Sequence, residues 1–332
     1  MLSFALHNYQ AKSYAKFELS RLSGKRSDIL KNIDGCEFES KLEVVNYINA
    51  QFINAASECG LLSPNIDLSR MSLANALPSA DRSLRFRPFT ALEIFTIINT
   101  KVANKPTKDI YEISTNLLIS IAFIICLSLQ ILFNRCLREG VYPKPLKEVK
   151  VCPQYKGKGS KTDPRCYRPI AIIPAVAKIL ENGLTTRITE FLNVTNALSD
   201  RQYAYRAGRS TTMLVREVVQ KVLEARERKN EVAVLFCDLS KAFDVADHNI
   251  LKMKLQHYGI DGPALDLLVD FLSERKQTVV SKAGSLKSMS QTAYNGIPQG
   301  SSLSNLAFTL LLNDLPLGIE NCEIYMYAEL AI

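Results

Sequence analysis

The sequence of 332 residues contains no tryptophan, three histidines and no pair of cysteines at Cys-x-x-Cys spacing. Zinc sites are usually built from closely spaced cysteines and histidines, so a zinc centre is not predicted. The first residues also lack the basic segment and apolar run of a secretory signal, and we expect an intracellular protein, in the cytoplasm, the nucleus or both. The scattered cysteines favour reduced, mostly buried thiols: Cys36, Cys59, Cys126, Cys136, Cys152, Cys166, Cys237 and Cys322.

Long apolar runs are also scarce, and residues 117–133 come closest to the length of a membrane span. Ser120, Ser128 and Gln130 interrupt this run, and Arg135 follows it in helical register. An interrupted run of this length favours a buried helix over a membrane-spanning one. No membrane partner is expected.

The composition, with 47% hydrophobic and 22% charged residues, is that of a folded protein with a sizeable core. The length predicts one large domain or two closely packed lobes. Residues 1–88 are expected to form a mostly helical N-terminal extension or linker, and residues 89–332 the main domain. Thr90 and Glu93 have the spacing of a capping box, so a helix is expected to begin there.

The net charge of +8 lies in one part of the chain. Residues 140–209 contain 13 lysines and arginines against five acidic residues, whereas the rest of the chain has equal numbers of the two. A basic stretch between neutral flanks is typical of a surface that faces phosphates, although a merely solvated face has the same composition.

Hydrophobic periodicity and turn residues predict a mixed α/β chain, with helices before and between short strands. A basic β-hairpin is expected from strands at 149–155 and 168–173. The other predicted elements are helices at 176–192, 214–222, 249–258 and 263–272, strands at 278–281 and 323–327, and an apolar helix that runs from the loop at 296–300 to about residue 313.

An apolar run at 231–237 has the length and β-branched content of a buried strand, and Asp238 follows it directly. A carboxylate at a strand end is held rigidly, which suits Mg²⁺ coordination and phosphoryl transfer. Such aspartates are also common helix N-caps, so both interpretations stay open for this residue alone. A phosphohydrolase with an aspartyl nucleophile is disfavoured, because it needs a second aspartate where Ser240 stands.

Four segments in fixed order carry a more specific signal. They are CPQYKGKG at 152–159 with DPRCYRPI at 163–170, LSDRQYAYRAGRST at 198–211, FCDLSKAFD at 236–244, and GIPQGSSL at 296–303 with NDLP at 313–316. This set resembles the fingers hairpin, the following block, palm motif A and palm motif B of the reverse transcriptases of non-LTR (LINE-type) retrotransposons. The resemblance covers about residues 90–332.

The resemblance implies an α/β right-hand polymerase with fingers and a partial palm, preceded by a helix-rich extension and lacking a thumb. It implies an RNA-directed DNA polymerase that acts on an RNA template, a DNA primer and deoxynucleoside triphosphates by two-metal nucleotidyl transfer. Asp238 and Glu329 are the implied catalytic carboxylates, and with the backbone carbonyl of Leu239 they are the implied ligands of Mg²⁺ or Mn²⁺. Arg206 and Arg209 are weaker candidates for contacts with the template.

The same resemblance implies a nucleotide-binding set. Lys156 and Arg168 would hold the triphosphate, the first as a point charge and the second as a bidentate fork. Phe243 would press against the sugar and exclude a 2′-hydroxyl, while Gln299 and Gly300 would contact the incoming nucleotide. Three alternatives stay open: a solvated basic pair, ordinary core packing of Phe243, and a purely structural turn around Gln299.

The sequence departs from the family in motif C, where Tyr-x-Asp-Asp is replaced by Tyr327-Ala328-Glu329-Leu330. The extra methylene of Glu329 moves its oxygens by roughly 1 Å, which an octahedral Mg²⁺ site tolerates poorly, and Leu330 has no carboxylate. The sequence ends at Ile332, before the expected return strand and thumb, so we expect a truncated copy. The prediction is a reverse transcriptase of impaired activity; the alternatives are an inactive RNA- or DNA-binding remnant and a chain that does not fold stably.

Overall fold

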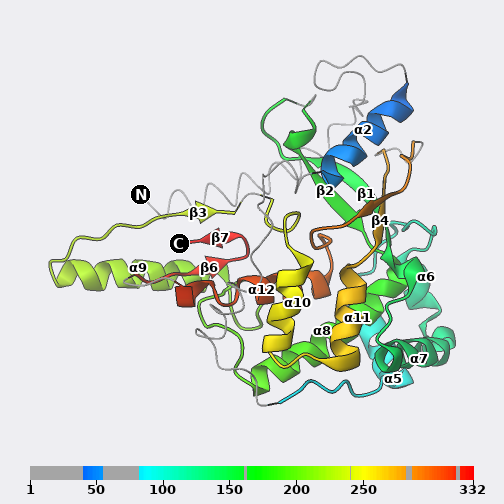
Figure 1. The fold of residues 1–332 in the computed structure, drawn as a ribbon, viewed down its shortest axis with the longest axis horizontal. Coiled ribbons are helices and arrows are strands. Elements are labelled where there is room, and N and C mark those ends of the chain that lie inside the picture. Colours follow the sequence, from blue (N-terminus) through cyan, green and yellow to red (C-terminus); the bar gives the residue numbers. More distant parts are fainter. Residues whose placement is uncertain (1–39, 55–81, 161–162, 240, 282–285, 319–321) are drawn as a thin grey trace.

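The computed structural model describes residues 40–54, 82–160, 163–239, 241–281, 286–318 and 322–332. Figure 1 shows a body of packed helices with one sheet standing on it, and a long helix and a smaller sheet that extend to one side. The mixed α/β class predicted from the sequence is confirmed. Much of the predicted helical extension at residues 1–88 lies outside the described residues.

The larger sheet has four strands in the order β2-β1-β4-β5. β1 (Glu148–Tyr155) pairs antiparallel with β2 (Tyr167–Ile172), and the connection contains the 3-10 helix η2 (Pro164–Cys166). The predicted hairpin is therefore confirmed. β1 also pairs in parallel with β4 (Arg275–Val279), which pairs antiparallel with β5 (Gln291–Ala293).

β4 begins three residues earlier than the sequence pattern predicts. Its first residues are polar, so a prediction based on hydrophobic periodicity does not include them in the strand. Lys276 is nevertheless paired on both sides, with Glu148 of β1 and with Thr292 of β5. The pairing with neighbouring strands therefore outweighs the local propensity.

An N-terminal helix, α2 (Lys41–Ile53), packs on β4 and β5. Ser40 caps it by accepting a hydrogen bond from the N–H of Glu43. Asn49 is fully buried at the contact, where its amide donates to the carbonyl of Met289 over 3.0 Å and accepts from the side chain of Gln277 over 2.9 Å. A buried amide with both ends paired fixes the helix on the sheet.

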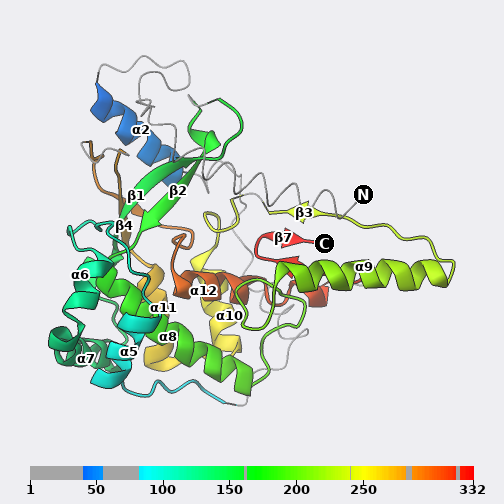
Figure 2. The same cartoon turned by 180° about the vertical axis from the view of Figure 1, so that it is seen from behind.

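The central element of the helical body is α8 (Ala175–Val194), which packs against α5 (Ala91–Thr100) and α12 (Ser302–Leu312) (Figure 2). Its apolar residues recur at helical spacing, as predicted, and five of them are at most 1% exposed: Ile179, Leu180, Leu184, Ile188 and Leu192. The body also contains α6 (Thr115–Ser120), α7 (Ala122–Glu139), α10 (His248–His257) and α11 (Gly262–Leu272), with the 3-10 helices η1 (Lys144–Lys147) and η3 (Leu315–Gly318).

The helix cap predicted at Thr90 is confirmed, and two further helices also begin at favourable residues. Thr90 accepts a hydrogen bond of 3.1 Å from the N–H of Glu93 at the start of α5. Pro263 lies in the first turn of α11, where its missing N–H costs no hydrogen bond. Asp247 caps α10 by accepting from the N–H groups of Asn249 and Ile250.

The apolar run at 117–133 forms α6 and most of α7, and the two helices are separated at Ile121. The prediction of a buried helix holds for one face of this run, and the other face is exposed. Phe133 on α7 is inaccessible, whereas Phe123 is 88% exposed. In the described part of the chain, no helix has the length and apolar character needed to span a bilayer.

The prediction of a buried strand at 231–237 is wrong. α9 (Thr211–Glu227) projects from the body, and the chain returns beside it as an extended, exposed segment (Figures 1 and 2). Only β3 (Cys237–Asp238) is paired, with the equally short β7 (Leu330–Ala331). The apolar residues before β3 have no strand beside them among the described residues, so Leu235 is 74% exposed and Phe236 is 65% exposed.

Candidate active site

A small sheet brings the two predicted catalytic carboxylates together. Its order is β3-β7-β6, with β6 at Met326–Tyr327. The register sets Asp238 directly opposite Leu330, and the N–H of Leu239 donates to the carbonyl of Glu329 over 3.1 Å. Asp238 therefore lies in β3 beside the turn between β6 and β7 that carries Glu329, and both residues are exposed.

The expectation that the sequence ends before the return strand is corrected. Leu330 and Ala331 form this strand, and it pairs with β6 on one side and β3 on the other. The pairing continues to Ile332, which exchanges two backbone hydrogen bonds of 2.8 Å with Tyr325. Two residues are enough because each is paired on both sides.

A segment far away in the sequence holds the turn between β6 and β7. Gln202 is 1% exposed, and its side-chain oxygen accepts hydrogen bonds from the N–H groups of Ala204 and Ala328, at 2.9 and 3.3 Å. The N–H of Tyr203 donates to the carbonyl of Met326 over 2.9 Å. Ala328 has a φ of +53°, which is costly for a residue with a side chain, so this anchoring stabilises the turn.

The donor set does not fit a two-metal centre. In the ranges that the structure describes, no group of three or more His, Cys, Asp or Glu side chains lies together. Leu330 stands opposite Asp238 and offers no oxygen, so Asp238 and Glu329 are the two carboxylates of this sheet edge. Two carboxylates leave much of the charge of two divalent ions uncompensated.

A second group of candidate residues surrounds the Gln299 loop, which we define as residues 296–301, between β5 and α12. The loop is tied to the segment after β3, because the N–H of Ile297 donates to the carbonyl of Phe243 over 2.7 Å. Gly296 has a φ of +84°, and a Cβ there would lie 2.8 Å from the carbonyl oxygen of Asp244. This position therefore requires glycine for two separate reasons. Gly300 is exposed and also has a positive φ.

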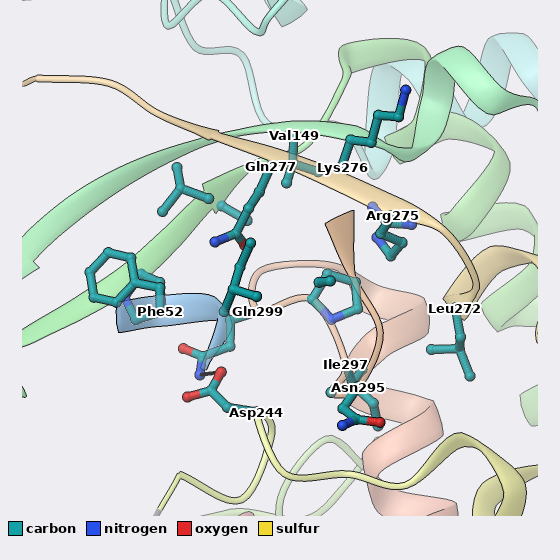
Figure 3. Close-up of a pocket in the computed structure, with 17 residues that line it drawn as sticks. Phe52, Val149, Asp244, Leu272, Arg275, Lys276, Gln277, Asn295, Ile297 and Gln299 are labelled. Carbon is teal, nitrogen blue, oxygen red and sulfur yellow. Dashed lines mark hydrogen bonds between the residues drawn. The ribbon is translucent and has the colours of Figure 1, made fainter. Parts of the chain in front are cut away.

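The Gln299 side chain reaches Asp244, to which its amide donates a hydrogen bond of 3.4 Å. Both residues line a cavity of about 70 Å³ between the larger sheet and the loop. Figure 3 shows them at one end of it, near Phe52 of α2, with Arg275 at the other end. Burial raises the pKa of Asp244 to about 6, although the positive charges of Lys241 and Lys156 and the hydrogen bond from Gln299 act in the opposite direction.

Phe243 lies in the hydrophobic core. Its ring is 9% exposed and stacks on Phe308 of α12, with ring centroids 4.1 Å apart and planes inclined by 14°. This is the packing arrangement that the sequence left open as an alternative. A contact between Phe243 and a sugar stays a prediction.

Lys156 and Arg168 lie on the hairpin of β1 and β2, and both are exposed. Gln154 pairs with Arg168, and side chains alternate along a strand, so Lys156 lies on the same face as Arg168. The Lys156 ammonium donates to the carbonyl of Arg165 over 2.6 Å. The structure therefore places both cations on one face of the hairpin. The positive charge of Lys156 also acts to lower the pKa of Asp244.

The weaker template candidates share one acidic partner. Arg209 forms an ion pair of 2.6 Å with Asp200, and Arg206 forms one of 3.6 Å with the same carboxylate. The guanidinium of Arg209 also lies over the ring of Tyr203, 5.0 Å from its centroid. These ion pairs stabilise the conformation of the segment around Gln202. A template phosphate would have to compete with the carboxylate of Asp200 for both guanidinium groups.

Two residues with structural consequences for the site were not singled out from the sequence. Gln202 lies within the sequence motif at 198–211, yet no pattern among its neighbouring residues indicates that it is buried. Glu181 had a usable signal, because it lies on the apolar stripe of α8, four residues after Ala177 and three before Leu184. A carboxylate on a buried stripe indicates a group that is paired with hydrogen-bond donors or a cation.

Comparison with known proteins identifies the family of this chain. Residues 157–329, just over half of the chain, match the model of the family described as reverse transcriptase (RNA-dependent DNA polymerase). The matched region contains β2, β3, the Gln299 loop and β6, whereas β1 and β7 lie just outside it. The chain belongs to the reverse transcriptase family.

The similar curated proteins come from mobile elements, and the resemblance to non-LTR retrotransposon reverse transcriptases is confirmed. The chain is 28% identical over 230 residues to the probable RNA-directed DNA polymerase from transposon X-element of Drosophila melanogaster, covering 69% of this chain and 25% of that protein. It is 31% identical over 188 residues to the RNA-directed DNA polymerase from mobile element jockey of the same organism, covering 57% and 20%. The chain thus spans a fifth to a quarter of these relatives.

Proposed function

We propose that this chain is the template- and nucleotide-binding part of an RNA-directed DNA polymerase, in which nucleotidyl transfer is strongly impaired. In this proposal residues 89–332 form the reverse transcriptase domain and residues 1–88 an N-terminal extension. The four-stranded sheet acts as the fingers and the three-stranded sheet as the palm. The family match and the names of the relatives support this assignment.

Nucleotide binding is assigned to the face of the basic hairpin and to the Gln299 loop. Lys156 and Arg168 supply positive charge for a triphosphate; Gln299 lines the cavity beside the hairpin, and Gly300 follows it as an exposed residue of the same loop. Phe243 supports this site from the core through Phe308. The ligands would be an RNA template, a DNA primer and a deoxynucleoside triphosphate, with the template near Arg206 and Arg209.

One observation carries the proposed impairment: Leu330 is paired with Asp238 where the family supplies a further carboxylate. Mg²⁺ or Mn²⁺ bound by the relatives' domain would supply charge neutralisation for the transferred phosphoryl group. Here Asp238, Glu329 and the carbonyl of Leu239 are the remaining oxygen donors. Loss of part of a preorganised electrostatic site costs about 100-fold or more in rate.

A primer-extension assay tests the impairment. The wild-type chain is compared with the double variant Glu329→Asp, Leu330→Asp, with a poly(rA) template, an oligo(dT) primer, dTTP and Mg²⁺. The double variant should incorporate nucleotide at least about 100-fold faster, because it regains the acidic pair. Adding Asp238→Asn to it should abolish that gain. Efficient incorporation by the wild-type chain would refute the impairment.

The second candidate function is nucleic-acid binding without chemistry, favoured by the exposed cations of the hairpin and the incomplete acidic set. RNA–DNA duplex affinity should fall steeply with salt, and Lys156→Ala with Arg168→Ala should weaken binding and lower the salt slope. If the restored double variant stays inactive while binding persists, this second function replaces the first.

A further inference from the structure

The proposal concerns Glu181, a carboxylate of α8 that is 1% exposed. It accepts a hydrogen bond of 2.8 Å from the hydroxyl of Tyr142, which is fully buried. Its second oxygen accepts a hydrogen bond from the hydroxyl of Ser301. Glu181 therefore connects the central helix of the body with the last residue of the Gln299 loop.

Ser301 has a double role at this point. It is the N-cap of α12, because its hydroxyl oxygen accepts a hydrogen bond of 3.3 Å from the N–H of Ser304. The same hydroxyl donates its hydrogen to Glu181. A side chain held from both sides in a buried place has one available orientation. The loop therefore meets α12 at a fixed point, two residues after Gln299.

Arg275 provides the opposite charge. It is 4% exposed at the start of β4, and one of its terminal nitrogens donates to the carbonyl of Phe271 over 2.9 Å. Its other two nitrogens find no acceptor among the residues that the structure describes. Burial raises the pKa of Glu181, and the charge of Arg275 is the largest of the opposing effects.

The same guanidinium lines the cavity that holds Gln299 and Asp244 (Figure 3). A buried cation and a buried carboxylate depend on each other, because either one alone carries a desolvation cost that nothing offsets. The cavity wall formed by β4 and the loop end held by Glu181 are thereby coupled. Neither residue lies at the small sheet that carries Asp238.

We propose that Glu181 is a positioning residue for nucleotide binding: it fixes Ser301, and through Ser301 it holds Gln299 toward Asp244 and the nucleotide. Glu181 is buried behind the loop and contacts no substrate. The inference rests on the proposed nucleotide-binding role of Gln299. Its structural half, the control of the Gln299 loop, is measurable without nucleotide.

The test compares Glu181→Gln with Glu93→Gln in the full chain. Glu93 is the matched control, because it also binds a buried side chain of α8, accepting from Arg187 at 2.8 and 2.9 Å. Amide hydrogen exchange is followed by mass spectrometry on peptides that cover the Gln299 loop. Glu181→Gln should speed exchange in the loop at least about tenfold, whereas Glu93→Gln should leave the loop unchanged.

A second pair of variants covers the case in which Glu181→Gln does not fold. Ser301→Ala and Tyr142→Phe each remove one hydroxyl that binds Glu181. Loop exchange should rise in Ser301→Ala and stay at the wild-type rate in Tyr142→Phe. Equal rates in the loop for wild type, Glu181→Gln and Ser301→Ala would overturn the proposal.

Nucleotide binding is the second readout. Affinity for dTTP is measured on poly(rA) with an oligo(dT) primer that lacks its 3′-hydroxyl, so incorporation is blocked. Glu181→Gln should raise the Kd for dTTP about tenfold at unchanged affinity for the duplex, and Glu93→Gln should not. An unchanged Kd overturns the positioning role. A wild-type chain that binds no dTTP refutes the proposed function of the loop, while the exchange result still decides whether Glu181 fixes it.

Discussion

The side-chain amide of Gln299 donates a hydrogen bond to the carboxylate of Asp244, although the two residues are 55 positions apart in the chain. Two backbone hydrogen bonds join the same two segments: the N–H of Ile297 donates to the carbonyl of Phe243, and the N–H of Gly296 donates to the carbonyl of Ala246. The segment after β3 and the Gln299 loop therefore form one unit. A substitution in either segment should therefore alter the structure of the cavity that both segments line.

The first prediction concerns pH. Burial raises the pKa of Asp244 from 3.8 to about 6 on folding. Between about pH 4 and pH 6 the folded chain keeps this proton while the unfolded chain loses it, so the free energy of unfolding falls as the pH rises through this window. Asp244→Asn cannot titrate. We expect this variant to be more stable than the wild type above pH 6, with the difference shrinking toward pH 4.

Chemical denaturation at several pH values, followed by circular dichroism, measures this difference. Other titrating groups cancel when the variant and the wild type are compared at each pH. A stability difference that is the same at pH 4 and pH 7 would contradict the prediction.

The second prediction separates two reasons for a glycine. Gly296 and Gly157 have nearly the same backbone angle, with φ of +84° and +85°. A Cβ at Gly296 would meet the carbonyl oxygen of Asp244 at 2.8 Å, whereas a Cβ at Gly157 would meet no atom within 4 Å. Gly157→Ala should therefore cost roughly 1 kcal/mol of stability, the cost of the angle alone. Gly296→Ala should cost about 2 kcal/mol more, because the backbone of the loop must also shift.

Both glycine variants are compared with wild type by urea denaturation. The Gln299 loop should lose its hydrogen-exchange protection in Gly296→Ala and keep it in Gly157→Ala. Equal costs for the two variants would show that the close approach to Asp244 is unimportant.

The third prediction concerns the anchor of the turn between β6 and β7. Gln202→Ala removes the acceptor for two backbone N–H groups, those of Ala204 and Ala328. A buried donor without a partner costs about 1–3 kcal/mol, so a loss in that range or above is expected in urea denaturation. Gln220→Ala on the exposed face of α9 is the matched control and should change stability by less than about 0.5 kcal/mol. If the Gln202→Ala variant is as stable as the Gln220→Ala variant, the Gln202 side chain does not stabilise this turn.

Much of the body was predictable because its patterns are local. The stripe of α8 and the cap at Thr90 depend on residues a few positions apart, the basic hairpin pairs segments that are close in the sequence, and the structure agrees with all three. The small sheet was not predictable in this way. Its anchor, Gln202, meets Ala328 across 126 positions, and no local pattern encodes such a contact.

The failed prediction at 231–237 has the same origin. Composition indicates that a segment can be a strand, but burial depends on whether a neighbouring strand is there to pair with it. At Asp238 the partner is present, and the chain is paired; at Leu235 none of the described residues provides one. The motifs predicted which residues belong to the candidate site. They could not predict how far apart these residues lie, because those distances depend on the fold.

The last prediction tests this exposure with one substitution at two places. Leu235 is 74% exposed and Leu184 is inaccessible to solvent. Leu184→Ala should lower the free energy of unfolding by about 2–5 kcal/mol, because it opens a cavity in the hydrophobic core. Leu235→Ala should change it by less than about 0.5 kcal/mol, because the side chain is already in water. Urea denaturation of both variants gives the comparison. A loss above 2 kcal/mol for Leu235→Ala would mean that the apolar run before Asp238 is buried in solution, as its composition alone predicts, and that the small sheet is wider than the three short strands described.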